Sequence, residues 1–230
     1  MKNATHIALV LDRSGSMESI ATDTVGGINR FIKDQQAVPG DCTLVLVQFD
    51  TQAIDKLRAL APIKDIALVN TSEFQPRALT PLWDAVGKTI VETGDYLKSL
   101  PEAQRPDKII FVVMTDGYEN SSRDYTHAQV RDMIQHQTDV YKWQFVFLGA
   151  NINSYAVGGA VGISGQNVMN YAPNSASVAA VYAATSSNVR SYRTGGSACM
   201  AFSEADREAQ EQAGADQTGA PKAKSKAKAK

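Results

Sequence analysis

The sequence predicts a doubly wound α/β domain, with a mostly parallel central sheet and helices on both of its faces. Three runs of nearly continuous hydrophobicity indicate buried strands, and they lie at 5–11, 43–49 and 108–115. Runs of this kind are typical of parallel strands, because helices cover both faces of a parallel sheet. Segments with helical spacing of apolar residues separate the runs, and this alternation favours right-handed crossovers.

The length and charge of the chain fit one such domain followed by a polar tail. A chain of 230 residues can bury one large α/β core but is short for two domains. Residues 1–219 carry 18 basic and 24 acidic side chains, a net charge of −6, whereas five lysines lie in the last ten positions. We expect the domain at 1–202 and a polar, disordered tail at 203–230, ending in a Lys/Ala-rich basic segment. Within the tail, residues 203–212 are compatible with a polar helix that Ser203 caps.

No segment predicts a membrane span or secretion. The apolar run at 109–114 is far shorter than the roughly 18 residues that suggest a transmembrane helix. The N-terminal apolar run, at 7–11, is shorter than the core of a signal peptide. Cys42 and Cys199 are too few for a disulfide framework and lack metal-ligand spacing, so we expect two reduced thiols. The sequence therefore predicts a cytoplasmic protein.

The first half of the chain predicts one helix between two buried strands, and then an edge strand. The helix is expected at 17–36, where a Pro-Gly pair shortly afterwards stops it. Gly26 and Gly27 interrupt it at a cost of about 1 kcal/mol each relative to Ala, and close approach to the sheet would explain them. Residues 53–60 alternate loosely and are expected to pair as an antiparallel edge strand. Residues 62–79 follow no periodic pattern.

The second half repeats the alternation of helices and strands. A helix is expected at 80–100, because Thr80 can act as its N-cap and Pro81 suits its first turn. A polar loop then leads to the run at 108–115, the strongest strand signal in the chain. The remaining expectations are helices at 126–138, 153–160 and 175–192, and strands at 142–148 and 167–171.

Oxygen-bearing side chains gather where the expected strands end. The first strand ends at Asp12, and Ser14 and Ser16 follow in the next loop. The strongest strand is followed by Asp116, and Thr80 heads the second helix. In an open α/β sheet, ligands bind outside the carboxyl ends of the strands, at a topological switch point. If the two strands are neighbours, these five side chains meet at one edge of the sheet.

The chemistry of this donor set favours a hard divalent cation. Two carboxylates and three neutral hydroxyls form an oxygen-only set that suits Mg²⁺, with Mn²⁺ or Ca²⁺ as alternatives, better than a dedicated high-affinity Ca²⁺ cage. Such a cation keeps an open or water-filled position, which a carboxylate from a partner protein could complete. The Asp-x-Ser-x-Ser loop alone does not decide the matter, because it could equally be a strand exit followed by a helix N-cap.

Three pieces of the sequence resemble the metal-ion-dependent adhesion site (MIDAS) of the von Willebrand factor type A (vWA) domain. They are Asp12-Arg13-Ser14-Gly15-Ser16, Leu79-Thr80-Pro81-Leu82 and Thr115-Asp116-Gly117. All five metal-associated positions match, and the order of elements agrees over residues 4–193. The resemblance implies an antiparallel third strand at the sheet edge. It also implies Ser14, Ser16 and Thr80 as direct or switchable ligands, with Asp12 and Asp116 coordinating directly or through water. The compact form looks like stand-alone bacterial or phage members, in the cytoplasm of a bacterium or a phage-infected host.

We expect a non-enzymatic, metal-dependent protein-interaction module that binds an Asp or Glu of an unidentified partner protein. In a first alternative, the protein is a nucleic-acid-associated scaffold whose basic C-terminal tail makes weak, salt-sensitive contacts. In a second, it is a metal-assisted phosphoester hydrolase, although Ser14 stands where an Asp-x-Asp phosphatase needs its second acid. The three histidines share no spacing that predicts a zinc site or a catalytic triad.

Ordinary structural roles are expected for the other polar residues near the predicted site. Asp50 is expected to be a surface-turn acid, and Arg13 is expected to point outward between the predicted ligands. Asp84 lies in the first turn of a helix, where an acid favours the helix dipole. Glu119 and Asn120 are expected to lie in an exposed loop.

Overall fold

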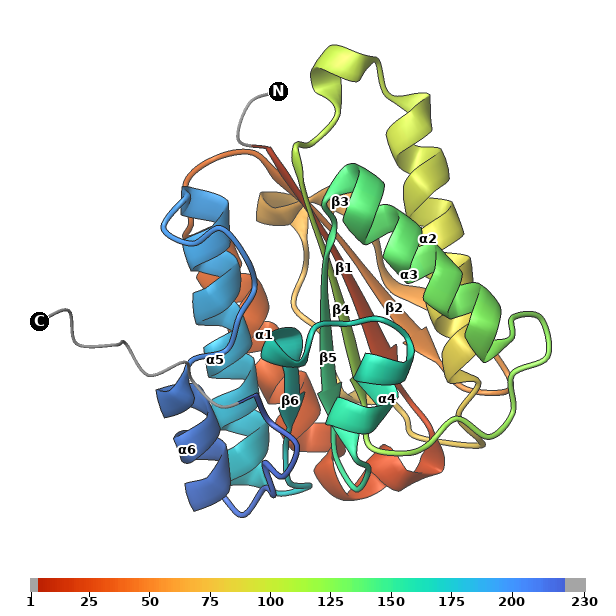
Figure 1. Ribbon diagram of the computed structural model, residues 1–230, viewed down its shortest axis with the longest axis vertical. Helices are drawn as coiled ribbons and strands as arrows, with labels where there is room; N and C mark the ends of the chain where they lie inside the picture. The colour runs from red at the N-terminus through yellow and green to blue at the C-terminus, as the bar shows by residue number, and fades with distance from the viewer. Residues whose placement is uncertain (1–3, 222–230) are drawn as a thin grey trace, which may run out of the picture.

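Six strands form the central sheet of the computed structural model, which describes residues 4–221 (Figure 1). Their order is β3-β2-β1-β4-β5-β6; β3 pairs antiparallel with β2, and every other neighbouring pair is parallel. The strands are β1 Thr5–Asp12, β2 Cys42–Phe49, β3 Ile54–Pro62, β4 Lys108–Thr115, β5 Gln144–Gly149 and β6 Val168–Asn170. The predicted fold class, with its single antiparallel edge strand, is confirmed.

Helices cover both faces of this sheet. They are α1 Ala21–Gln36, α2 Leu82–Ser99, α3 His127–Tyr141, α4 Ser154–Ala160, α5 Ser175–Thr194 and α6 Glu204–Gln212. Short 3-10 turns lie at η1 Gly15–Ile20, η2 Ile63–Asp65, η3 Thr71–Glu73, η4 Glu102–Gln104 and η5 Gly165–Asn167.

The central strand β1 divides its side chains between two hydrophobic cores, because successive strand residues point to opposite faces. Ile7 and Leu9 pack in the core under α1 and α5, whereas Ala8 and Val10 pack in the core under α2, α3 and α4. Figure 1 shows these two groups of helices on opposite sides of the sheet. All eight residues of β1 are buried, which explains why its sequence is nearly continuous in hydrophobicity.

The first crossover differs from the sequence prediction in two respects. Its first turn is the 3-10 turn η1, and the α-helix begins only at Ala21. Gly27 is required by helix α5 rather than by the sheet, because an added Cβ would lie 2.1 Å from the Tyr182 ring. Gly26 has open space around its Cα, so close packing accounts for one of the two glycines.

Within residues 4–221, none of the helices combines the length and the apolar character that crossing a bilayer would need. Cys42 is buried and Cys199 is exposed, and both are free thiols.

The segment that follows α5 is packed against the domain, where the sequence predicts mainly disorder. Ser203 caps α6 through a capping box, as expected. Beyond it, Arg207, Gln210 and Gln217 are buried. Gln217 donates to the carbonyl of Asn170 in the edge strand β6 at 2.7 Å. Polar side chains make these contacts, so no apolar periodicity in the sequence predicts them. The Lys-rich residues 222–230 lie outside the described part of the chain.

Arg207 is the centre of this C-terminal packing, and its loss should destabilise the fold. Its guanidinium donates to the Tyr155 hydroxyl, to Val168 O at 2.9 Å, and to the carbonyls of residues 165 and 166 at 3.2 Å. Because hydrogen bonds to a charged group contribute about 1.5–3 kcal/mol, we expect Arg207→Ala to lower the free energy of unfolding by about 2 kcal/mol or more. Urea denaturation measures this. The exposed Arg190→Ala is the matched control, and equal stability of the two variants would contradict the expectation.

Candidate functional site

Two hydrogen bonds join the carboxyl ends of the neighbouring strands β1 and β4. Asp12 is the last residue of β1, and Thr115 is the last residue of β4. The Thr115 hydroxyl donates to Asp12 Oδ2 at 2.6 Å. Ser16, in the turn after β1, donates its hydroxyl to Asp116 Oδ1 at 2.6 Å. The two acids predicted from the sequence therefore lie at the same edge of the sheet.

The loop after β1 folds back so that its hydroxyls face the acids. The backbone N–H of Ser14 donates to Asp12 Oδ1 at 2.7 Å. The hydroxyl oxygens of Ser14 and Ser16 lie 3.1 Å apart. A carboxylate that accepts a backbone hydrogen bond two residues on is a local Asx turn, so part of the orientation of Asp12 and Ser14 is set within this loop.

Thr80 reaches the same place from the start of α2. A Cβ added at Gly117 would lie 3.7 Å from Thr80 Oγ1 and 3.8 Å from Ser16 Oγ, so these two hydroxyls flank Gly117. Thr80 does not cap the helix, contrary to the sequence prediction, because α2 begins at Leu82 with Pro81 as its N-cap. Among residues 4–221, the Thr80 hydroxyl has no hydrogen-bond partner, which leaves its oxygen available at the site.

Three polar residues that the sequence assigns to ordinary positions hold these loops. Asn120 accepts from the Thr80 N–H at 2.9 Å and donates its own N–H to the Thr80 carbonyl at 3.2 Å. Glu119 accepts from the Trp83 N–H at 3.0 Å at the start of α2. Asp84 accepts three backbone N–H groups of residues 123–125, at 2.8 to 2.9 Å. They tie the loop after β4 to α2, and their partners lie too far away in sequence to be predicted.

The electrostatics of the site favour a bound cation. Burial raises the pKa of Asp12 to about 6, against the hydrogen bonds from Thr115 and Ser14 that lower it, and the charge of Asp116 adds to the rise. Burial also raises the pKa of Asp116, although the Ser16 hydroxyl opposes this rise. Asp116 Oδ2 is buried without a hydrogen-bond partner in the described structure. A buried carboxylate oxygen without a partner is costly, and a cation beside it would remove that cost.

The donor set fits a cation that accepts neutral oxygen ligands. Within residues 4–221, no group of three or more His, Cys, Asp or Glu side chains is arranged to hold a metal. A metal here would depend on two carboxylates, on hydroxyls and on water. Mg²⁺ keeps several waters and needs only one or two carboxylates from the protein, so the residues present fit it.

Comparisons with known proteins place the fold. No protein-family model matches the chain, and no curated protein matches it significantly. Among solved structures, proximal thread matrix protein 1 from the mussel byssus, with a zinc-occupied MIDAS motif, superposes with a TM-score of 0.57 at 12% identity, over 78% of this chain and 46% of that one. The von Willebrand factor type A protein from Catenulispora acidiphila gives 0.53 at 9% identity, over 81% and 43%. The VWA domain of SpRpn10 gives 0.51 at 9% identity, over 76% and 92%.

The chain has the von Willebrand factor type A fold. It spans less than half the length of the mussel and Catenulispora proteins. At these identities the likeness concerns the fold. The five residues predicted from the sequence lie at the carboxyl edge of this vWA fold, between β1 and β4.

Beside the five residues, the protein buries a charged group that the sequence assigns to the surface. Asp50, which directly follows β2, is 1% exposed, and its Oδ2 accepts from Arg13 Nε at 2.8 Å and from Arg77 Nε at 2.9 Å. Arg13 is 5% exposed rather than outward-pointing, and its Nη1 lies 3.8 Å from Asp55. The loop of Asp12 and Ser14 is thus anchored by an ion pair, whose partner is 37 residues away.

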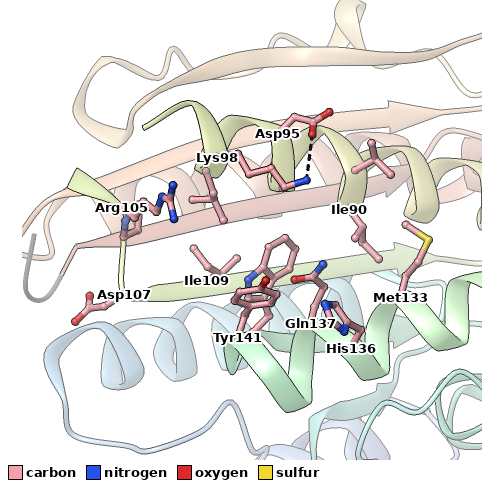
Figure 2. Close-up of a pocket in the computed structure, with 15 residues that line it drawn as sticks. Ile90, Asp95, Lys98, Arg105, Asp107, Ile109, Met133, His136, Gln137 and Tyr141 are labelled. Atoms are coloured by element: carbon pink, nitrogen blue, oxygen red, sulfur yellow. Dashed lines mark ion pairs between the residues drawn. The ribbon is translucent and has the colours of Figure 1, made fainter. Parts of the chain in front are cut away.

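Figure 2 shows a cavity of about 380 Å³ between α2 and α3. Ile90, Ile109 and Met133 line its apolar part. Asp95 and Lys98, which also line it, form an ion pair with 3.9 Å between Lys98 Nζ and Asp95 Oδ1. Because Ile109 lies near the start of β4, this cavity is at the opposite end of the strands from Asp116. It does not contribute to the candidate site.

Asp50 should be essential for the stability of the site loops. Removing its carboxylate leaves Arg13 buried with only the more distant Asp55, and breaking a buried ion pair costs about 3–5 kcal/mol. We expect Asp50→Ala to lower the free energy of unfolding by about 3 kcal/mol in chemical denaturation. Asp50→Asn should cost less, because it can still accept from the backbone N–H groups of residues 52 and 53. The exposed Asp132→Ala is the control, and a loss at Asp50 no larger than at Asp132 would contradict this interpretation.

Proposed function

We propose that this protein is a metal-dependent protein-interaction module, in which a divalent cation at the carboxyl edge binds a carboxylate of a partner protein. The residues that would hold the cation are Asp12, Ser14, Ser16, Thr80 and Asp116. The single observation that carries the proposal is the buried, unpartnered Asp116 Oδ2, which lies in a cluster of oxygen donors. Bound Mg²⁺ would supply a hard positive charge for a carboxylate oxygen.

The charge and the chemistry of the site support binding rather than catalysis. Within residues 4–221, no third acidic side chain joins Asp12 and Asp116 in a metal-holding group, so a further carboxylate on the cation would come from a partner. The loop after β1 carries Ser14 in the position where a phosphatase of the Asp-x-Asp type would need its second acid. The vWA fold of the mussel protein with a zinc-occupied MIDAS motif is consistent with this proposal. We also propose that the protein is a compact cytoplasmic one, of bacterial or phage origin.

Titration with Mg²⁺ tests the proposed site. When the free Mg²⁺ concentration is about 100-fold above its Kd, linkage stabilises the folded protein by about 2.7 kcal/mol. We expect calorimetric binding and this stabilisation for the native protein, and neither for Asp116→Asn. Because Asp116 is buried with an unpartnered oxygen, the metal-free Asn variant should be at least as stable as the metal-free native protein.

Asp132→Ala, on the exposed side of α3, is the matched control and should bind Mg²⁺ normally. The proposal fails if the native protein shows no saturable binding of Mg²⁺ or Mn²⁺. It also fails if Asp116→Asn and Asp12→Asn respond to the cation as the native protein does.

A further inference from the structure

Three exposed side chains surround the candidate site, and we refer to Arg77, Leu79 and Tyr118 as the rim. Leu79 is 54% exposed and Tyr118 is 57% exposed. The Arg77 side chain is 43% exposed. Of the six large hydrophobic side chains that are exposed within residues 4–221, two belong to the rim: Leu79 directly precedes Thr80, and Tyr118 lies two residues after Asp116. Exposed apolar side chains around a polar site are typical of an interaction surface.

The rim crosses the carboxyl edge of the sheet from β2 to β5. Residues 77–78 run beside the loop after β1, because the Arg77 N–H donates to Arg13 O and the Gly15 N–H donates to Ala78 O. Arg77 binds Asp50 at the end of β2. At the other end, the Tyr118 hydroxyl accepts from the Asn153 N–H beyond β5 at 3.3 Å. With the strand order β2-β1-β4-β5, the candidate site lies midway between Arg77 and Tyr118.

Arg77 keeps most of its hydrogen-bonding capacity free. Only its Nε is used, toward Asp50, and within residues 4–221 its two Nη groups have no partner. Arg13 shares Asp50 but is buried and also adjoins Asp55. An exposed guanidinium with both Nη groups open is suited to bidentate binding of a carboxylate. The rim therefore offers a second carboxylate site beside the metal residues.

We propose that the partner presents an extended acidic segment with two acidic residues two positions apart, one for the metal residues and one for Arg77. Neighbouring strands lie about 4.8 Å apart, so a point midway between β1 and β4 lies about 7 Å from β2. An extended chain advances about 3.3 Å per residue, and residues two apart point to the same side. This inference rests on the proposed function, because the first acid is the one that reaches the cation.

The Tyr118 side of the rim favours an uncharged residue of the partner. A cleft of about 420 Å³ begins at Tyr118 and is lined by the neutral side chains of Asn151, Asn153 and Tyr171. Asp216 also lines it, and hydrogen bonds from Thr218 lower the pKa of this carboxyl below its ordinary value. A third acid of the partner would be repelled by this negative charge. The surface is thus asymmetric, with a preference for acids on the Arg77 side.

A random-peptide phage library selected on the full chain in Mg²⁺, with elution by EDTA, tests this inference. The native protein should enrich peptides with the pattern acid-x-acid. Arg77→Gln should still enrich peptides with one acid but should lose the preference for the second. Arg77→Lys should give an intermediate preference, because it keeps the charge and loses the planar fork. The exposed Arg131→Gln on α3 should select as the native protein does.

A synthetic peptide with the pattern Glu-Ser-Glu gives the quantitative measurement by fluorescence anisotropy. We expect Arg77→Gln to weaken its binding about tenfold, from the loss of a charge-assisted hydrogen bond. Calorimetric Mg²⁺ affinity should fall by much less than tenfold, because Arg77 also holds Asp50 beside the site loops, and saturable Mg²⁺ binding shows that the variant is folded. The inference would be overturned, and the proposed function left intact, if the native protein selected EDTA-sensitive peptides with only one acid. The same holds if Arg77→Gln selected the same peptides as the native protein. Absence of any EDTA-sensitive peptide, despite Mg²⁺ binding, would overturn both.

Discussion

The hydrogen bonds between the ends of β1 and β4 bring two acids together in a buried place, and the rest of the site depends on them. Thr115 donates to Asp12, and Ser16 donates to Asp116, each at 2.6 Å. Two neighbouring carboxylates repel each other, and burial removes the water that would screen them. Burial raises the pKa values of both acids, and at Asp12 the charge of Asp116 adds to the rise. The central pair of strands thus creates a negative site that a cation can neutralise.

Polar residues outside the site keep its loops in place. Asp84 gathers three backbone N–H groups from the loop after β4. Asp50 binds two arginines at the start of the neighbouring loops. Such charge-assisted hydrogen bonds are stronger than neutral ones, so they help to fix the loops at the carboxyl edge. The same arrangement leaves Arg77 exposed beside the site, and in this way the support of the loops and the proposed recognition of a partner share one residue.

Much of the fold was predictable because its signals are local. The buried strands and the amphipathic helices have periods of about two and 3.6 residues, which a short window of sequence reveals. The cap of α2 was not predictable in this way. Thr80 resembles an N-cap, yet the first N–H groups of α2 bind Glu119 and Ser122, which lie 36 and 38 residues away. The C-terminal packing was missed for the same reason, since it is made by buried polar groups such as Gln210.

The sequence by itself determined the order of the elements, the parallel character of the sheet and the five oxygen donors at the ends of its segments. Hydrophobic period and the position of a residue at the end of a strand are properties of neighbouring residues, so they can be read without coordinates. Only the tertiary structure decided which polar groups meet: that Asp50 is buried between Arg13 and Arg77, and that one oxygen of Asp116 has no partner. The partners of a hydrogen bond are set by distances between distant segments, and those distances exist only once β1 and β4 lie side by side.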